Sequence, residues 1–261
     1  MTIPMLLHAQ KTGISLSGGA ALGYAHIGFL QAMDEAGIKP DCITGTSMGA
    51  IMGMMYCAGY SPQKIKQIVK DERMDELVVL ARPGLHHNGG LVGTEKIQQV
   101  LLKYVPHNSF DSLKIPFYCC TVNMNTLELI YRGKGDQLVQ YVMASAAVPA
   151  VFAPVTIDGD YYIDGGVSCN LPVQPLLDEA CNQRIAVNLR LVKPMNNLKA
   201  RNIWNRAFMF SIYATSFRTL SMFTDTVEID PGTCRMYDFN RLDDLYEIGY
   251  RAGRKHFNNK P

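Results

Sequence analysis

Charged side chains are scarce in this sequence, and those present nearly cancel. Of its 261 residues 18% are charged, the net charge is only +2, and no run of five or more like charges occurs. A nucleic-acid surface is therefore not expected, because phosphate backbones are held by clustered lysine and arginine. The hydrophobic fraction of 48% is instead typical of a globular chain with a substantial core.

The seven cysteines form no C-x-x-C pair, and their number is odd. This pattern argues against a disulfide framework and predicts buried free thiols in a reducing compartment. No cluster of His and Asp has the spacing of metal ligands either, so we expect neither a metal nor a cofactor.

The start of the chain has neither a basic segment nor a full apolar segment, so a secretory signal is not evident and a cytoplasmic location is expected. Two uncharged runs, Cys42–Gln63 and Gln137–Ile157, are long enough to span a membrane. The first contains four glycines, the second is broken by Pro149 and Pro154, and neither has basic flanks. We therefore predict that both are buried parts of the core.

Segments with strand patterns alternate with segments of helical periodicity. The predicted strands are 13–17, 41–44, 116–122, 127–131, 155–157, 161–163, 184–189 and 226–229, and the predicted helices are 22–36, 48–58, one starting at 61, 94–104, 137–147, 173–180, 200–223 and 243–257. No repeat or linker interrupts them. This order predicts a layered α/β fold with a mainly parallel sheet, in one domain over 1–261.

Three glycine turns each follow a predicted strand: Gly18-Gly19, Gly45-x-Ser47-x-Gly49 and Asp164-Gly165-Gly166. In open α/β sheets, binding sites form at the carboxyl ends of strands. We therefore expect the three turns to converge in space, although they lie far apart in the sequence.

Ser47 is the candidate nucleophile. Glycines two residues before and after it would relieve crowding between strand and helix, and the following helix would aim free N–H groups at the site. The alternative is a chance G-x-S-x-G in a glycine-rich sequence, because short motifs are weak without context.

The first glycine turn offers bare N–H groups for an oxyanion hole, from Gly18, Gly19 and Ala20. A dinucleotide site competes, since Gly18-x-Ala20-x-x-Gly23 followed by Asp41 resembles a G-x-G-x-x-G fingerprint. The middle glycine is alanine, however, and Asp41 lies at the beginning of its strand rather than at its end, so this alternative is disfavoured. No Gly-Lys-Ser/Thr follows, which excludes a P-loop.

Asp164 is the candidate general base for Ser47, although Asp-Gly-Gly is also a common turn. A triad would need a histidine as well. His256 lies among charges near the end of the chain, His26 is more typical of a packed side chain, and His86-His87 lies in a glycine-flanked loop. None has the turn context of Ser47, so we favour a Ser-Asp dyad.

Four blocks in order resemble the patatin-like phospholipases, from about residue 12 to 192: Leu16-Ser-Gly-Gly-x-x-x-Gly23-x-x-His26-Ile-Gly28, Gly45-Thr-Ser-Met-Gly49, Ala144-Ser-Ala-Ala-Val-Pro149-x-x-Phe152-x-Pro154 and Asp164-Gly-Gly-Val-x-x-Asn170-x-Pro172. The resemblance implies a serine acyl hydrolase acting on phospholipid or other acyl esters. It further implies Ser47 as nucleophile, Asp164 as base, the Gly18–Ala20 loop as oxyanion hole, and a structural, pocket-lining block around Pro149.

Two positions depart from the family pattern. Ala20 replaces the third glycine of the loop, which we expect to be tolerated at a negative φ, and Leu22 replaces a frequent Arg or Lys. A non-catalytic regulatory or lipid-binding member of the family is therefore the alternative.

Residues 200–223 suggest how lipid could reach the site. Aromatic and apolar residues (Trp204, Phe208, Ile212, Phe217) lie near arginines (Arg201, Arg206, Arg218), as in an interfacial helix. A core helix or a homo-oligomer contact would show the same pattern and is more common. Met52, Met54 and Met55 could line an acyl pocket, but such methionines more often fill a core.

Overall fold

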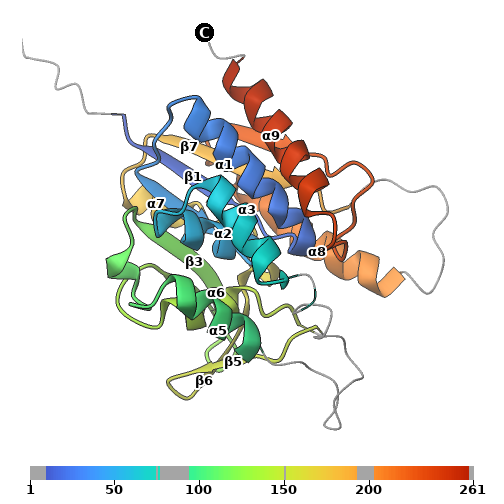
Figure 1. Cartoon of the computed structure of the whole chain (residues 1–261). Helices are drawn as coiled ribbons and strands as arrows, with labels where there is room; N and C mark the ends of the chain where they lie inside the picture. Colours follow the sequence, from blue (N-terminus) through green and yellow to red (C-terminus); the bar gives the residue numbers. More distant parts are fainter. Residues whose placement is uncertain (1–9, 75, 77–93, 150, 193–202, 259–261) are drawn as a thin grey trace, which may run out of the picture.

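The computed structural model describes residues 10–74, 76, 94–149, 151–192 and 203–258 (Figure 1). Its strands are β1 (Thr12–Leu16), β2 (Cys42–Gly45), β3 (Phe117–Asn123), β4 (Glu128–Arg132), β5 (Val155–Ile157), β6 (Asp160–Asp164), β7 (Gln183–Leu189) and β8 (Asp225–Ile229). Its α-helices are α1 (Ala25–Glu35), α2 (Met48–Cys57), α3 (Pro62–Asp71), α5 (Glu95–Tyr104), α6 (Leu138–Ser145), α7 (Gln174–Asp178), α8 (Ile203–Leu220) and α9 (Leu242–Asn258), and short 3₁₀ turns cover η1 (Ala20–Tyr24), η2 (Phe110–Ser112) and η3 (Gly165–Val167).

The sheet is mixed and mainly parallel, as predicted. Strand β1 pairs in parallel with β2 and β7, β2 pairs in parallel with β3, and β7 pairs in parallel with β8. The antiparallel pairs are β3 with β4, β3 with β6, and β5 with β6. The antiparallel part is thus confined to the β3 end of the sheet.

Strands β2 and β6 meet end to end along the same edge of β3. Cys119 pairs with β2 on one side and with β4 on the other, so β2 and β4 flank β3. Thr121 pairs with β4 and with Asp164, so β6 lies on the side of β2. Because Gly45 pairs with Cys119 and Asp164 with Thr121, the two strand ends lie two residues apart along β3.

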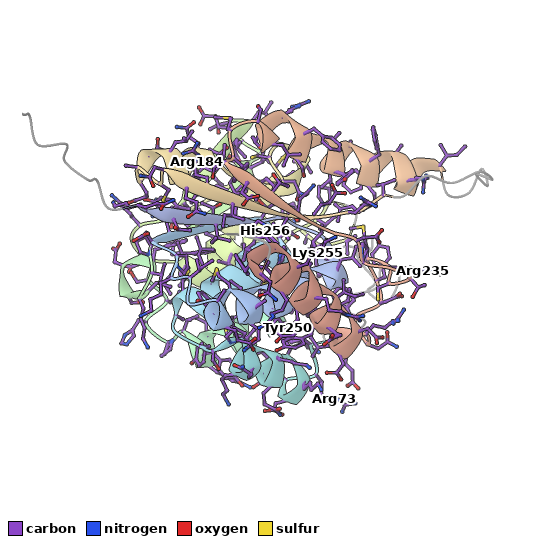
Figure 2. All side chains as sticks on the ribbon, turned by 90° about the horizontal axis from the view of Figure 1, so that it is seen from above. Arg73, Arg184, Arg235, Tyr250, Lys255 and His256 are labelled. Carbon is purple, nitrogen blue, oxygen red and sulfur yellow. The ribbon has the colours of Figure 1, made fainter. Side chains whose placement is uncertain are left out.

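Helices cover both faces of the sheet, which Figure 2 shows nearly edge-on. One face packs a large core with α1, α2, α3, α5, α6 and α9. The other packs a smaller core in which Leu171, Leu176 and Phe223 join β-strand residues, with Leu220 of α8 against them. The site described below lies between these layers.

Helices α1 and α9 lie side by side (Figure 1). Their backbones approach closely at two glycines: a side chain on Gly28 would overlap the Tyr246 carbonyl, and one on Gly249 would overlap the Ala25 carbonyl. The C-terminal helix therefore braces the helix that follows the first glycine turn.

The two uncharged runs are core elements, as predicted: the first contains β2 and α2, and the second contains α6 and β5. Within the described ranges, no helix combines the length and the apolarity needed to cross a membrane. All seven cysteines are free and buried, as expected.

Candidate active site

Ser47 occupies a strained turn between β2 and α2. Its backbone angles are φ 55° and ψ −125°, which a residue with a side chain rarely adopts. Its side chain is 6% exposed, and its N–H donates a hydrogen bond to Ser145 Oγ at 3.0 Å. The turn is therefore held from outside by the end of α6.

Two glycines make this turn possible because strand and helix cross with no room for a side chain. A Cβ on Gly45 would lie 2.6 Å from the Gly49 carbonyl oxygen, and one on Gly49 would lie 2.6 Å from the Ser17 carbonyl oxygen. A third position is equally close: a side chain on Gly23 would overlap the Met48 side chain. The relief of crowding predicted for the G-x-S-x-G spacing is confirmed.

Asp164 ends β6 and is 2% exposed. Its carboxylate accepts the Gly166 N–H at 2.7 Å, and the Ser47 side chain lies near enough to favour its ionised form. Burial raises the pKa of the Asp164 carboxyl from its usual 3.8 to about 7, and the interactions with Gly166 and Ser47 oppose that rise. The Asp164 N–H donates to the Ala147 carbonyl at 3.0 Å, so the last residue of α6 and the residues just after it fix both Ser47 and Asp164.

The convergence of the Ser47 and Asp164 turns at strand carboxyl ends was predicted and is confirmed. Strand β6 runs antiparallel to β3, whereas β2 runs parallel to it, so the two strands approach from opposite directions. Asp164 reaches Ser47 because the carboxyl end of β6 lies where β2 stops. The Asp164 turn leads into the short η3, in which Gly165 has no space for a side chain beside Cys120.

The first glycine loop differs from expectation at two of its three predicted donors. The Gly18 N–H already donates to Asn170 Oδ1 at 3.0 Å, which removes it as an oxyanion donor. Ala20 has φ 48°, so the negative φ at which we expect alanine to be tolerated is not present, and the residue adopts a left-handed conformation that glycine would take at lower cost. In the described part of the chain, the N–H groups of Gly19, Ala20 and Met48 have no acceptor.

Buried polar residues behind the loop were not singled out from the sequence. Asn170 is fully buried: it accepts from Gly18, its own N–H donates to Thr215 Oγ1 at 2.9 Å, and its Nδ2 donates to Ser216 Oγ at 3.2 Å. Ser145, which holds Ser47, is also fully buried. Ser145 and Asn170 belong to the two sequence blocks 144–154 and 164–172 that resemble the patatin-like phospholipases. Their place in those blocks is the one sequence signal that could have identified them.

An apolar cavity of about 50 Å³ adjoins Ser47. It is lined by Ala20, Ser47, Met48, Ile51, Met74, Ile97, Met143, Ala146, Val148, Phe152 and Phe239. The methionines suggested for an acyl pocket, Met52, Met54 and Met55, are almost fully buried core residues instead. Pro149 lies in the turn that carries Val148 and Phe152 to the cavity.

The structure gives His26 and His256 structural positions. His26 is fully buried, and because a carbonyl only accepts, its Nε2 donates to the Ser17 carbonyl oxygen at 2.7 Å. Burial lowers the pKa of His26 to about 4, so the ring is neutral and supports the loop strand. His256 is not the solvated residue we expected: its side chain is 13% exposed, and Nε2 lies 3.2 Å from Asp225 Oδ2. His86 and His87 lie outside the described residues.

Asp41 lies at the wrong end of the sheet for a ribose contact. Its carboxylate accepts the Thr12 N–H at 2.7 Å, at the start of β1 and opposite the glycine loop. Among the described residues, no group of three His, Cys, Asp or Glu could hold a metal ion.

Helix α8 is in part the core helix that we considered more common. Ile212 is buried beside Gly166, and Thr215 and Ser216 contact Asn170. Phe217 is 52% exposed, and Phe208 is half-buried. The side chain of Trp204, and Arg201, lie outside what the structure describes.

Comparison with known proteins identifies the family. The model of the patatin-like phospholipase family matches residues 14–177, more than half of the chain. The chain belongs to the patatin-like phospholipase family. The crystal structure of VipD from Legionella pneumophila has a similar fold, with a TM-score of 0.52 at 14% identity over 95% of this chain and 67% of that one.

Two relatives show how far the similarity extends. An uncharacterised NTE family protein of Mycobacterium bovis is 30% identical over 181 residues, which are 69% of this chain and 49% of the relative. The lysophospholipase nte1 of Aspergillus terreus is 26% identical over 282 residues, which cover 96% of this chain and 18% of that protein. The chain thus spans about half the length of the first relative and less than a fifth of the second.

Proposed function

We propose that the protein is a serine acyl hydrolase that cleaves carboxylic esters of lipids, of the phospholipase A or lysophospholipase type or as a general esterase. One observation carries the proposal: Ser47 lies beside a buried aspartate, Asp164, whose pKa is about 7 and is influenced by the Ser47 side chain. A base with a pKa near the working pH is best placed to take a proton in the transition state. Membership of a phospholipase family and the lysophospholipase named among the relatives support a lipid substrate.

The proposed reaction has two stages. Ser47 Oγ attacks the ester carbonyl while Asp164 takes its proton, and the proton then passes to the leaving alcohol oxygen. Water, deprotonated by Asp164, hydrolyses the acyl-Ser47 intermediate and regenerates both side chains. No step requires a metal or a cofactor.

Free N–H groups beside Ser47 would stabilise the tetrahedral oxyanion. Those of Gly19 and Ala20 come from the first loop, and that of Met48 is at the positive end of α2. Gly18 contributes indirectly, because its bond to Asn170 fixes the loop that presents the other two.

The apolar cavity beside Ser47 would receive the acyl chain. Its volume of about 50 Å³ is far below the ~300 Å³ at which ligand pockets usually begin. Entry of an acyl chain therefore requires the lining side chains to move. The three methionines of the lining, Met48, Met74 and Met143, are the most adaptable of these.

The small cavity and the strained Ala20 favour one alternative, a non-catalytic lipid-binding or regulatory member of the family. A hydrolysis screen separates the two. Purified wild type is assayed with p-nitrophenyl esters of increasing chain length and with phospholipids and lysophospholipids. We expect turnover that Ser47→Ala abolishes; no turnover of any ester by the folded wild type would favour the alternative.

Access to membrane lipid is a further part of the proposal. Ile203, Phe210 and Phe217 recur every seven residues of α8, so they share one face, and each is about half exposed. Such a stripe suits peripheral contact with a lipid surface, or with a second copy of the chain. Flotation with vesicles, compared with sedimentation of the protein alone, distinguishes them.

A further inference from the structure

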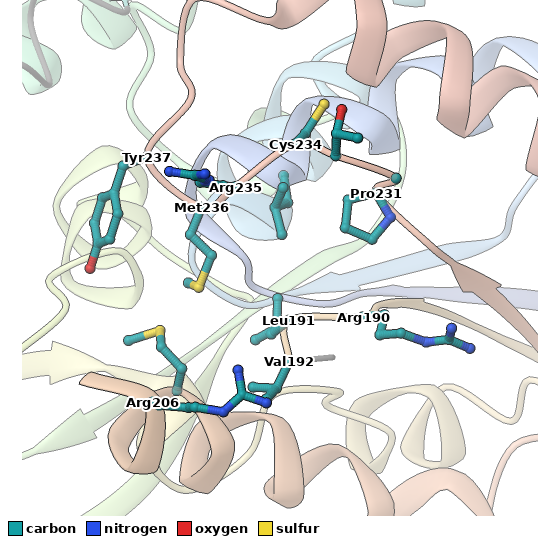
Figure 3. A pocket seen from close by; sticks show the side chains of 13 residues that line it. Arg190, Leu191, Val192, Arg206, Pro231, Cys234, Arg235, Met236 and Tyr237 are labelled. Carbon is teal, nitrogen blue, oxygen red and sulfur yellow. The ribbon is translucent and has the colours of Figure 1, made fainter. Parts of the chain in front are cut away.

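A second and larger cavity, of about 490 Å³, lies on the far side of the first glycine loop (Figure 3). The two cavities share the same wall. Ala20 and Phe239 line the apolar one, whereas Leu22, Met236 and Tyr237 line the larger one. The Ala21 N–H donates to the Met236 carbonyl at 3.0 Å and so ties the loop to the segment between β8 and α9.

Three arginines line the larger cavity, and no acidic side chain is among its described lining residues. Arg190 is committed elsewhere: it pairs with Glu228 at 2.7 Å and Asp230 at 3.1 Å, and in Figure 3 its guanidinium points away from the other two. Arg206 rises from α8 and Arg235 projects from the loop on the opposite side (Figure 3).

Arg235 brings positive charge to the cavity without a compensating carboxylate. Within the described ranges, no carboxylate oxygen lies within 4 Å of its guanidinium, although its backbone N–H donates to Asp238 Oδ2 at 2.8 Å. The remaining lining, including Leu22, Met209 and Met236, is largely apolar. The cavity thus combines guanidinium groups on two walls with an apolar floor.

We propose that this cavity binds a phosphate ester group, and that in the lipid substrate this group is the headgroup phosphate. The inference rests on the proposed function, since it places in the larger cavity the polar headgroup of the lipid substrate, which the apolar cavity cannot hold. Guanidinium forks match phosphate oxygens and form charge-assisted hydrogen bonds with them. The glycine loop would then lie beneath the ester, with the acyl chain on one side and the phosphate on the other.

The test measures binding, so that it does not depend on turnover. Titration calorimetry on the Ser47→Ala variant compares lysophosphatidic acid with a monoacylglycerol of the same acyl chain, both below their aggregation concentrations. We expect the phosphate-bearing lipid to bind at least ~10-fold tighter. The advantage should disappear when Arg206→Gln and Arg235→Gln are combined on that background, and persist with Arg251→Gln, an exposed arginine paired with Glu247 on α9.

Glycerol 3-phosphate alone identifies the source of the phosphate. Arginine-dependent binding as tight as that of lysophosphatidic acid would assign the cavity to free phosphate esters and overturn the headgroup assignment. Equal binding of the two lipids, or an advantage that survives the double substitution, would overturn the proposal entirely. Circular dichroism shows whether the double variant is folded. Arg235→Lys, which keeps the positive charge, is a second control and should keep most of the affinity advantage.

The proposed function can fail independently. If wild type hydrolyses no neutral p-nitrophenyl ester while the arginine-dependent advantage persists, the cavity recognises phosphate in a non-hydrolytic protein. If ester turnover is present and the advantage absent, the enzyme stands without this headgroup site.

Discussion

The Ser47 turn and the Asp164 turn lie side by side but meet different physical demands. At Ser47 the cost is in the backbone, which is held at φ 55° where only glycine is comfortable. At Asp164 the backbone is relaxed, with φ −52°, and the cost is electrostatic, because a fully buried carboxyl must ionise to act. Backbone strain positions the nucleophile, and burial raises the pKa of the base.

Both turns depend on the same support. Ser145 and Ala147, at the end of α6, bind the backbone N–H groups of Ser47 and Asp164. One short segment therefore holds both turns in place. Substitutions in the two turns should differ in their effects on stability and on activity.

Removing the base should have the largest effect. We expect Asp164→Asn to lower kcat/KM for a p-nitrophenyl ester by about 10²–10⁴-fold, the usual contribution of a general base. Asp158→Asn, in the exposed β5–β6 hairpin where φ is 52°, is the matched control and should leave turnover unchanged. Comparable activity of the two variants would remove Asp164 from the mechanism.

The same substitution should stabilise the fold at high pH. The folded-state pKa of Asp164 lies above the unfolded value of 3.8, so the native protein binds more protons between about pH 4 and pH 7 and loses stability as pH rises through that window. We expect Asp164→Asn to exceed wild type in the free energy of unfolding by about 4 kcal/mol at pH 8, and to match it near pH 4. Urea unfolding at both pH values measures this, and an equal difference at both would contradict buried ionisation.

Loss of the support under Ser47 should act through the backbone. Ser145→Ala leaves the buried Ser47 N–H without its acceptor, which costs about 1–3 kcal/mol. Turnover should fall while the pH dependence of activity stays unchanged. Ser211→Ala is the control, because that hydroxyl bonds the Phe208 carbonyl on an exposed face of α8, and its effect should stay within about 0.5 kcal/mol. Equal unfolding midpoints of the two variants would exclude the role given to Ser145.

The smallest effect concerns the loop between the cavities. Ala20→Gly should raise the free energy of unfolding by about 1 kcal/mol, because glycine adopts φ 48° without strain. Ala21→Gly, one residue on in the buried η1 turn, should lower it instead. Thermal unfolding of both variants checks the opposite signs, and destabilisation by Ala20→Gly would mean that the loop takes a negative φ.

The features of the site that depend on neighbouring residues could be predicted from the sequence. Gly45 and Gly49 mark a crowded turn because the crowding arises within a few residues, and Asp164 and Ser47 are conspicuous because each follows a strand. The order of strands and helices was enough for a mainly parallel sheet. The conformation of such a turn depends mainly on residues close to it in the sequence.

The remainder depends on contacts between distant segments. The end-to-end meeting of β2 and β6 follows from strand pairing along β3, which no local pattern encodes. Asn170 and Ser145 are important because they accept hydrogen bonds from Gly18 and Ser47, which are distant in the sequence. A single polar residue in an apolar run does not indicate which residue it will contact. The positive φ of Ala20 is not evident from the sequence for the same reason, since the loop is held by Asn170 and Met236 from elsewhere in the chain.

Labelling by an active-site fluorophosphonate between pH 5 and 9, followed by peptide mass spectrometry, tests the Ser47–Asp164 pair most directly. We expect one adduct, on Ser47, formed at a rate that rises with pH to a plateau with a midpoint near the Asp164 pKa of about 7. Asp164→Asn should slow it by about 100-fold or more. An adduct elsewhere, or equally fast labelling of Asp164→Asn, would contradict it.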